Sequence, residues 1–143
     1  MRLNLDCVRD VLLCVEENTD HHHRCTFVDF GPTETMCSIE SDDSIPEYQV
    51  KLHTQYTNDE LIYHVHYCLE ANLIRKYLIH GSAILISDLT PFGHEFLNNI
   101  REDNVWNGVK SIASKVGAKS LEAVTQISSN VVTELIKSHF GIR

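Results

Sequence analysis

The sequence predicts an α+β fold, in which helices pack against a small antiparallel sheet. Apolar residues recur at helical spacing in several segments, most clearly in residues 4–17 and 121–140. Between these segments, residues 74–79 and 83–87 have the composition of two strands, and Gly81 supplies the turn that joins them. A length of 143 residues with 43% hydrophobic content suits one domain with an appendage.

Residues 4–17 predict the first helix. Asn4 can cap it, and Asp6 lies in the first turn, where the helix dipole favours an acid. Apolar residues form two stripes along the segment, so we expect a helix that is buried on two sides. The stripes consist of Leu5, Val8, Leu12 and Val15 and of Cys7, Val11 and Cys14.

Residues 18–47 predict an acidic insert, with seven acidic residues against one basic residue, Arg24. Short strands are expected at residues 25–30 and near 36–39, because a connection of this length without structure would be unusual. Residues 47–54 alternate Tyr, Val and Leu with polar residues, and this pattern predicts a half-buried strand.

Residues 57–72 predict the next helix. Thr57 and Glu60 form a capping box, and Asn72 tolerates the left-handed backbone that ends many helices. The predicted core stripe consists of Leu61, Val65, Cys68, Leu69 and Leu73. The opposite, exposed face should then show Asp59, Tyr63, His66, Tyr67 and Glu70.

A further helix is expected after the hairpin, capped by Thr90 with Pro91 in its first position. Its core-facing residues should be Phe92, Phe96, Leu97 and Ile100. Residues 104–140 predict a helical extension with a break near Gly117. We therefore expect a domain over residues 1–103 and a C-terminal extension over residues 104–143.

The net charge of −8 is unevenly distributed. Residues 1–56 carry net −7, residues 57–103 net −4 and residues 104–143 net +3. The acidic front repels phosphate, and only the tail could attract it. Five cysteines without a CxxC pair, no long apolar run and a charged N-terminus predict a reduced, cytoplasmic protein that is neither secreted nor membrane-spanning.

Two motifs resemble parts of a winged helix. "LEANLI" resembles the "LxxAGLI" end of a winged-helix third helix, and "LTPFGHEFL" resembles the "LTxxGxxFL" start of the helix after the wing. The resemblance implies a winged-helix-like core with a wing at the hairpin. The compact second helix and turn of a helix-turn-helix are not apparent between Glu17 and Thr57, where the acidic insert stands.

The chain also resembles a family of uncharacterised proteins, a domain of unknown function that is common in bacterial phages and prophages. The matching segments are "LNLDCVRDVLLCVEEN", "YTNDELIYHVHYCLEANLI", "ISDLTPFGHEFLNNIREDNVWN" and "SLEAVTQISSNVVTELI". This resemblance implies a bacterial or phage setting. It implies no known activity, substrate or catalytic residue.

The exposed face of the helix at residues 57–72 is the first candidate site. It contains no Lys or Arg, so it suits DNA poorly, whereas exposed aromatic residues are typical of protein interfaces. We expect a non-catalytic regulatory or interaction protein that binds a host or phage protein through Asp59, Tyr63, His66, Tyr67 and Glu70. The equally weighted alternative is that other elements cover this face as core.

The alternative function is a DNA-binding transcriptional regulator, which fold analogy favours. Its binding residues would be Arg75, Lys76, Lys110, Lys115 and Lys119. Placement of these cations on one face beside residues 57–72 would favour DNA, and placement of the acidic insert there would disfavour it.

No enzyme, metal site or cofactor is expected. The run Asp20-His21-His22-His23-Arg24-Cys25 contains metal-ligand residue types, but successive side chains of an extended loop point in different directions. Nucleophile motifs and phosphate-binding loops are absent from the sequence.

The tail stripe could pack on the domain, pair with a second copy or lie on a membrane. Few cations flank it, so membrane binding is disfavoured. We expect a homodimer through Leu121, Val124, Ile127, Val131 and Leu135.

Overall fold

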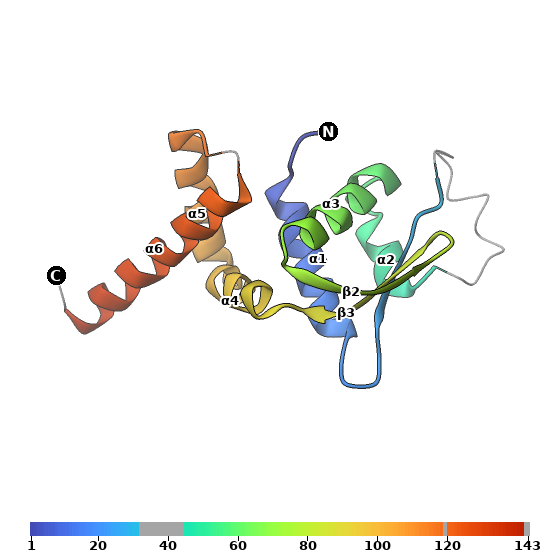
Figure 1. Cartoon of the computed structure of the whole chain (residues 1–143). Coiled ribbons are helices and arrows are strands. Elements are labelled where there is room, and N and C mark those ends of the chain that lie inside the picture. Colours follow the sequence, from blue (N-terminus) through green and yellow to red (C-terminus); the bar gives the residue numbers. More distant parts are fainter. Residues whose placement is uncertain (32–44, 119, 142–143) are drawn as a thin grey trace. The chain divides into compact units, whose positions relative to one another are not determined.

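The computed structural model of the chain describes residues 1–31, 45–118 and 120–141. These residues form six helices and three strands, which confirms the expected α+β fold (Figure 1). The elements are α1 (Leu5–Asn18), β1 (Cys25–Val28), α2 (Glu47–Leu52), α3 (Asn58–Glu70), β2 (Ile74–His80), β3 (Ala83–Leu89), α4 (Pro91–Ile100), α5 (Asp103–Val116) and α6 (Leu121–Phe140). They fall into two compact units, Met1–Gly93 (the first unit) and His94–Arg143 (the second unit).

The sheet of the first unit is antiparallel with the strand order β1–β3–β2. Phe27 of β1 lies opposite Ile84 of β3, and Ile79 of β2 lies opposite the same residue. Gly81 has a φ of 59° in the turn between β2 and β3, a conformation that glycine adopts without steric cost. The predicted hairpin is therefore confirmed, and β1 is the strand expected at residues 25–30.

The core of the first unit lies between α1, α3 and the sheet. Both predicted stripes of α1 are buried apart from Leu5, which is half-buried. Phe27 and Ile86 from the sheet and Leu61 from α3 are fully buried as well. The expectation that α1 is buried on two sides is confirmed.

The strand predicted at residues 47–54 is wrong, because this segment forms the helix α2. Gln49, at a polar position of the alternating pattern, is fully buried, whereas Val50 is 43% exposed. Pro46 precedes the helix with extended backbone, as is typical of a residue in the N-cap position. The unit thus contains the second helix that is not apparent in the sequence, followed by a turn and α3.

Side chains of α2 pair with the free edge of β1. The Val28 N–H donates to Oε1 of Gln49 and Nε2 of Gln49 donates to the Val28 carbonyl, both at 2.8 Å. The Tyr48 hydroxyl accepts from the Thr26 N–H at 2.7 Å and donates to the Thr26 carbonyl at 3.0 Å. Two side chains therefore satisfy four backbone groups that a further strand would otherwise pair.

The ends of α3 follow the local signals in the sequence. Oγ1 of Thr57 accepts from the Glu60 N–H at 3.2 Å, which confirms the N-terminal cap. At the other end Asn72 has a φ of 62°, and the Leu73 N–H donates to the Cys68 carbonyl. This pattern is a Schellman motif that turns the chain directly into β2.

The start of α4 is held against the end of α3. Oγ1 of Thr90 donates to the Asn72 carbonyl at 2.6 Å and accepts from the Gly93 N–H at 2.9 Å. A Cβ at Gly93 would collide with the carbonyl oxygen of Leu73, so only glycine fits here. Phe92 is 40% exposed, so its predicted place in the core is wrong. The buried side of α4 begins at Gly93 and continues through Phe96, Leu97 and Ile100.

The second unit is built on α5 and α6. Gly117 ends α5 with a left-handed φ of 69°, which confirms the predicted break, and Ser120 caps α6. Trp106, Val109 and Val124 are buried in this unit. Burial does not extend along the whole of α6: Leu121 is 5% exposed but Leu135 is 52% exposed.

Candidate interaction surface

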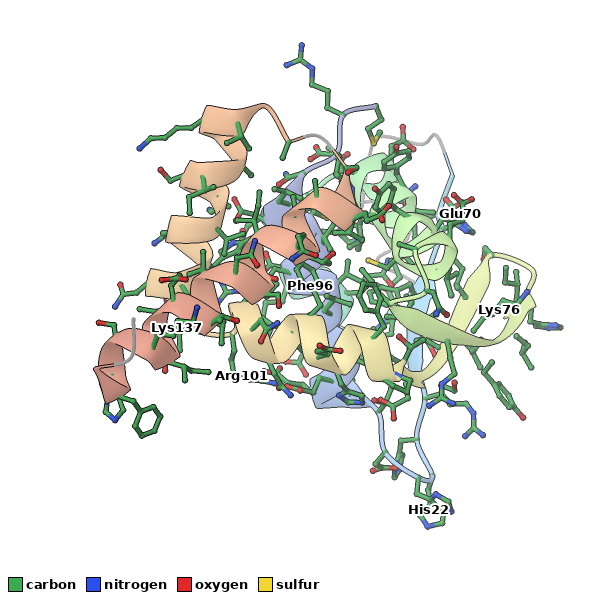
Figure 2. The ribbon with its side chains drawn as sticks, turned by 60° about the vertical axis from the view of Figure 1, so that its left-hand side comes forward. His22, Glu70, Lys76, Phe96, Arg101 and Lys137 are labelled. Carbon is green, nitrogen blue, oxygen red and sulfur yellow. The ribbon has the colours of Figure 1, made fainter. Side chains whose placement is uncertain are left out.

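The outward side of α3 carries the residues that the sequence places in the candidate site. Asp59, His66 and Glu70 are exposed, Tyr63 is 37% exposed and Tyr67 is half-buried. We call these five residues the α3 face; Glu70 marks its C-terminal end in Figure 2. The described residues of α3 include three acids and no Lys or Arg, so the surface is acidic and aromatic.

Two tyrosines form the aromatic part of the α3 face. The ring centroids of Tyr63 and Tyr67 are 6.4 Å apart and the rings are tilted by 32°. Tyr63 also contacts the ring of His64 edge-on, with centroids 5.1 Å apart. Because His64 is fully buried, this contact restricts the Tyr63 side chain before any partner binds.

His64 links α3 to the start of α1. Its Nδ1 lies 2.6 Å from the Glu60 carbonyl, and its Nε2 accepts from the Asn4 N–H at 2.8 Å. A neutral imidazole with its proton on Nδ1 satisfies both contacts. The helical pattern does not reveal this role, because Asn4 lies sixty residues away in the sequence.

Tyr56 holds the turn before α3 on α1. Its hydroxyl donates to Oδ2 of Asp10 at 2.6 Å. Burial, and secondly the hydrogen bond to the Asp10 carboxylate, raise the pKa of Tyr56. With His64, this contact fixes both the start and the middle of α3 against α1.

Acidic groups also surround the interface between α1 and α3. Burial, followed by the nearby charges of Asp10 and Glu60, raises the pKa of the Cys7 thiol to about 12. Asp10 and Glu60 add two further negative charges beside the α3 face, and these charges disfavour the approach of a phosphate group.

Three of the six basic side chains of the first unit lie on or beside the hairpin. Arg75 and Lys76 are exposed on β2, and the Arg24 guanidinium carbon lies 3.9 Å from the centroid of the Tyr77 ring. Tyr77 and Ile79 are about half exposed. The side chain of Lys76 points away from the body of the first unit in Figure 2. We call Arg24, Arg75, Lys76 and Tyr77 the wing patch.

The tail lysines belong to the second unit. Lys110 is half-buried, with its Nζ 5.7 Å from the centroid of the Trp106 ring, and Lys115 is exposed. Lys119 lies outside the described residues, as do residues 36–39, where a second short strand is expected. The gathering of the tail lysines with Arg75 and Lys76 on one face stays the condition that would favour the DNA-binding alternative.

The histidine run forms a turn held by Asp20. The carboxylate of Asp20 accepts from the N–H groups of His22 and His23 at 2.7 Å, and Nδ1 of His23 lies 2.9 Å away. The backbone hydrogen bond from His22 and the side-chain bond from His23 lower the pKa of Asp20. Across the described ranges, no three His, Cys, Asp or Glu side chains lie close enough to hold a metal ion.

Comparison with known proteins identifies a family without an assigned function. Residues 2–119 match the family described as "Hypothetical protein (DUF2513)". An uncharacterised protein of Haemophilus influenzae is 30% identical over 87 residues, which cover 58% of this chain and 74% of that protein. No solved structure matches the chain. Among the helices in the described part of the chain, none is both long and apolar enough to cross a membrane. The chain belongs to the DUF2513 family.

Proposed function

We propose that the chain is a non-catalytic interaction protein that binds another protein through the α3 face. The observation that carries the proposal is the composition of this face: exposed acids and two neighbouring tyrosines, without a Lys or Arg in α3. Protein interfaces favour aromatic residues, and tyrosine is enriched among the residues that dominate binding energy.

The arrangement of the first unit supports a winged-helix scaffold for this role. Its helices and strands follow the order α1–β1–α2–α3–β2–β3, with the sheet order β1–β3–β2. A winged helix usually presents its third helix to the major groove, with cations on the phosphates. Here α3 presents acids instead, which favours a protein partner over a duplex on the same scaffold.

The partner that fits the α3 face has an apolar contact for the tyrosines and cations for Asp59 and Glu70. Tyr63 is already held against His64, so little side-chain entropy is lost when it is covered. A bacterial host or phage setting, in the cytoplasm, is part of the same proposal. The relative from Haemophilus influenzae supports a bacterial setting for the family.

The test is photocrosslinking in bacterial cells, with p-benzoylphenylalanine in place of Tyr63. We expect one discrete adduct with a protein partner, and none when the same photoreactive residue replaces the exposed Glu17 on α1. With the purified partner, Tyr63→Ala with Tyr67→Ala should weaken binding at least about 30-fold, the effect of losing about 2 kcal/mol at a hot spot. Phe92→Ala, at an exposed aromatic residue of α4, is the matched control and should leave the affinity within about threefold.

Urea denaturation of the Tyr63→Ala variant shows whether weaker binding results from a loss of folding stability. Tyr63 is partly exposed, so its loss should lower the free energy of unfolding by no more than about 1 kcal/mol. A larger loss of stability without a loss of binding would mean that the α3 face serves the core, and would contradict the proposal.

A DNA-binding regulator is the second candidate, and the wing patch favours it. Cations beside an aromatic ring are typical of nucleic-acid surfaces. Arg24 stacks on the Tyr77 ring, and Arg75 and Lys76 directly precede Tyr77 on β2. A wing would bring them to the phosphates beside the groove. The net charge of −9 on the first unit, from six basic and fifteen acidic side chains, opposes this function over long range.

Fluorescence anisotropy with mixed-sequence duplex DNA at 20 and 200 mM salt separates the two candidates. The interaction proposal predicts no saturable binding at either concentration. Binding that weakens more than about 100-fold at the higher salt, and that Arg75→Glu with Lys76→Glu abolishes, would establish the DNA candidate instead. Arg2→Glu with Lys51→Glu, at two exposed positions outside the hairpin, is the matched control, because it also reverses two positive charges.

A further inference from the structure

The second half of α6 carries apolar side chains that are left exposed. Leu135 and Ile136 are each 52% exposed and Phe140 is 69% exposed, whereas Leu121 and Val124 in the first half are buried. The apolar stripe of α6 therefore continues past the part of the helix that is buried. Exposed apolar clusters of this kind mark interaction sites.

A groove lies beside these side chains, entirely within the second unit. Its volume is about 310 Å³, and it runs between the end of α4, the start of α5 and the second half of α6. The apolar part of its lining consists of Val105, Val132, Leu135, Ile136 and Phe140, and the other four lining residues are polar or charged. Leu135, Ile136 and Phe140 belong both to the groove and to the exposed stripe, and we call this joint surface the α6 groove.

The charges of the chain indicate what covers the α6 groove. The first unit has a net charge of −9 and repels a second copy of itself, whereas the second unit has six basic and five acidic side chains, net +1. In the second half of α6, Glu134 and Lys137 stand on either side of Leu135 and Ile136. When two such helices cross antiparallel at Leu135 and Ile136, Glu134 of each copy comes opposite Lys137 of the other. This complementarity of charge favours a second copy of the chain, and the scarcity of cations disfavours a lipid surface.

We propose that the chain forms a homodimer in which each α6 groove receives the second half of α6 from the other copy. The two helices cross antiparallel about a twofold axis near Leu135 and Ile136. Both copies therefore contribute the same residues to the interface. Phe140 of each copy enters the groove of the other. Leu121 and Val124, which the sequence assigns to a dimer interface, are buried within one chain and lie outside this contact.

The size of the contact sets the expected affinity. The contact involves half of a twenty-residue helix and one groove from each copy. The area that it buries is therefore smaller than the more than about 2,000 Å² that obligate dimers bury. The dimer should therefore dissociate reversibly, with a Kd on the order of micromolar.

Sedimentation equilibrium of the full chain from about 1 to 300 μM tests the proposal. We expect a monomer–dimer equilibrium in this range, and a Kd at least about 30-fold higher for Leu135→Glu with Phe140→Glu, two exposed positions at which glutamate keeps the helix. The matched control is Gln126→Glu with Asn130→Asp, which adds the same charge on a side of α6 outside the groove. A monomer at 300 μM overturns the proposal, as does a dimer that resists the groove substitutions.

A second readout keeps the test independent of folding defects in the variants. With p-benzoylphenylalanine in place of Ile136, irradiation should yield a covalent dimer, because this position lies close to the twofold axis. The same residue in place of the exposed Asn130 should yield none. Equal crosslinking at both positions, or none at 136 in a chain that dimerises, would contradict the antiparallel crossing through the α6 groove.

Discussion

At the scale of single residues, two buried polar side chains organise the first unit. Gln49 satisfies both backbone groups of Val28, and His64 joins the Asn4 N–H to the carbonyl of Glu60. Each is fully buried and each has partners for its polar atoms. Burying a polar group costs little free energy when all its hydrogen bonds are made. Removing the group leaves its buried partners with no hydrogen bond to protein or to water.

Replacing Gln49 with leucine should therefore be costly, although leucine has a similar size. The Val28 N–H and carbonyl would both lose their partners, so we expect the free energy of unfolding to fall by about 2–4 kcal/mol. Urea denaturation followed by circular dichroism measures the change. Lys51→Gln changes an exposed position of the same helix, and its free energy of unfolding should stay within about 0.5 kcal/mol of the parent value. Equal stability of Gln49→Leu and the parent would show that β1 does not need α2.

The buried thiols make stability depend on pH in the alkaline range. The pKa of Cys7 is raised from 9.0 to about 12, so above pH 9 the unfolded chain releases the thiol proton while the folded chain retains it. The unfolded state then binds fewer protons, and the free energy of unfolding falls as pH rises, by at most about 1.4 kcal/mol per pH unit for this group. Urea denaturation between pH 8 and 10.5 should show a shallower fall for Cys7→Ala than for the parent. Parallel curves would argue against the raised pKa.

At the scale of elements, helix ends position the α3 face. Thr57 and Asn72 set the two ends of α3, and the turn after Asn72 leads directly into β2. Thr90 and Gly93 then hold the start of α4 against the carbonyls of Asn72 and Leu73, in the turn that follows α3. The four residues form a continuous set of caps, so the orientation of α3 depends on close backbone packing rather than on its own helical propensity.

Gly93→Ala tests this packing. The added Cβ would meet the Leu73 carbonyl, so the start of α4 must shift, and we expect a loss of at least about 2 kcal/mol in the free energy of unfolding. Gly108→Ala is the matched control, because Gly108 lies inside α5 with open space around it and alanine is the better helix former there. In the same denaturation experiment, the free energy of unfolding of the Gly108→Ala variant should rise by up to about 1 kcal/mol. An unchanged free energy of unfolding in the Gly93→Ala variant would mean that α4 is not held against Leu73.

At the scale of the whole molecule, the charges are divided between the two units. The first unit carries net −9 and presents the α3 face, while the second is nearly neutral and presents the α6 groove. This division suits two different contacts, one with a partner of opposite charge and one with a second copy of the chain.

Dimerisation would make thermal stability depend on protein concentration. The melting temperature of the parent should rise between about 2 and 200 μM, because association stabilises the folded chain by mass action. Leu135→Glu with Phe140→Glu should remove this dependence, whereas Gln126→Glu with Asn130→Asp should preserve it. Differential scanning fluorimetry measures all three. A melting temperature of the parent that stays constant over this range would argue against the dimer.

The sequence by itself determined the boundaries that depend on neighbouring residues. Asn4, Thr57 and Thr90 cap helices through hydrogen bonds to residues two to three positions further along the chain, and Asn72 and Gly117 end helices through their own backbone conformation. Such interactions are visible in a short window of sequence. The α3 face follows from them, because helical periodicity assigns its exposed residues once the ends are known.

Only the tertiary structure decided the features that depend on distant residues. The alternation in residues 47–54 predicts a strand, but Gln49 binds a backbone 21 residues away, and burial of this polar side chain selects the helix α2. The anchor from His64 to Asn4 and the exposure of Phe92 and Leu135 likewise depend on which surfaces meet. Apolar periodicity shows that a side chain prefers burial, but the packing of other elements determines whether a covering surface exists.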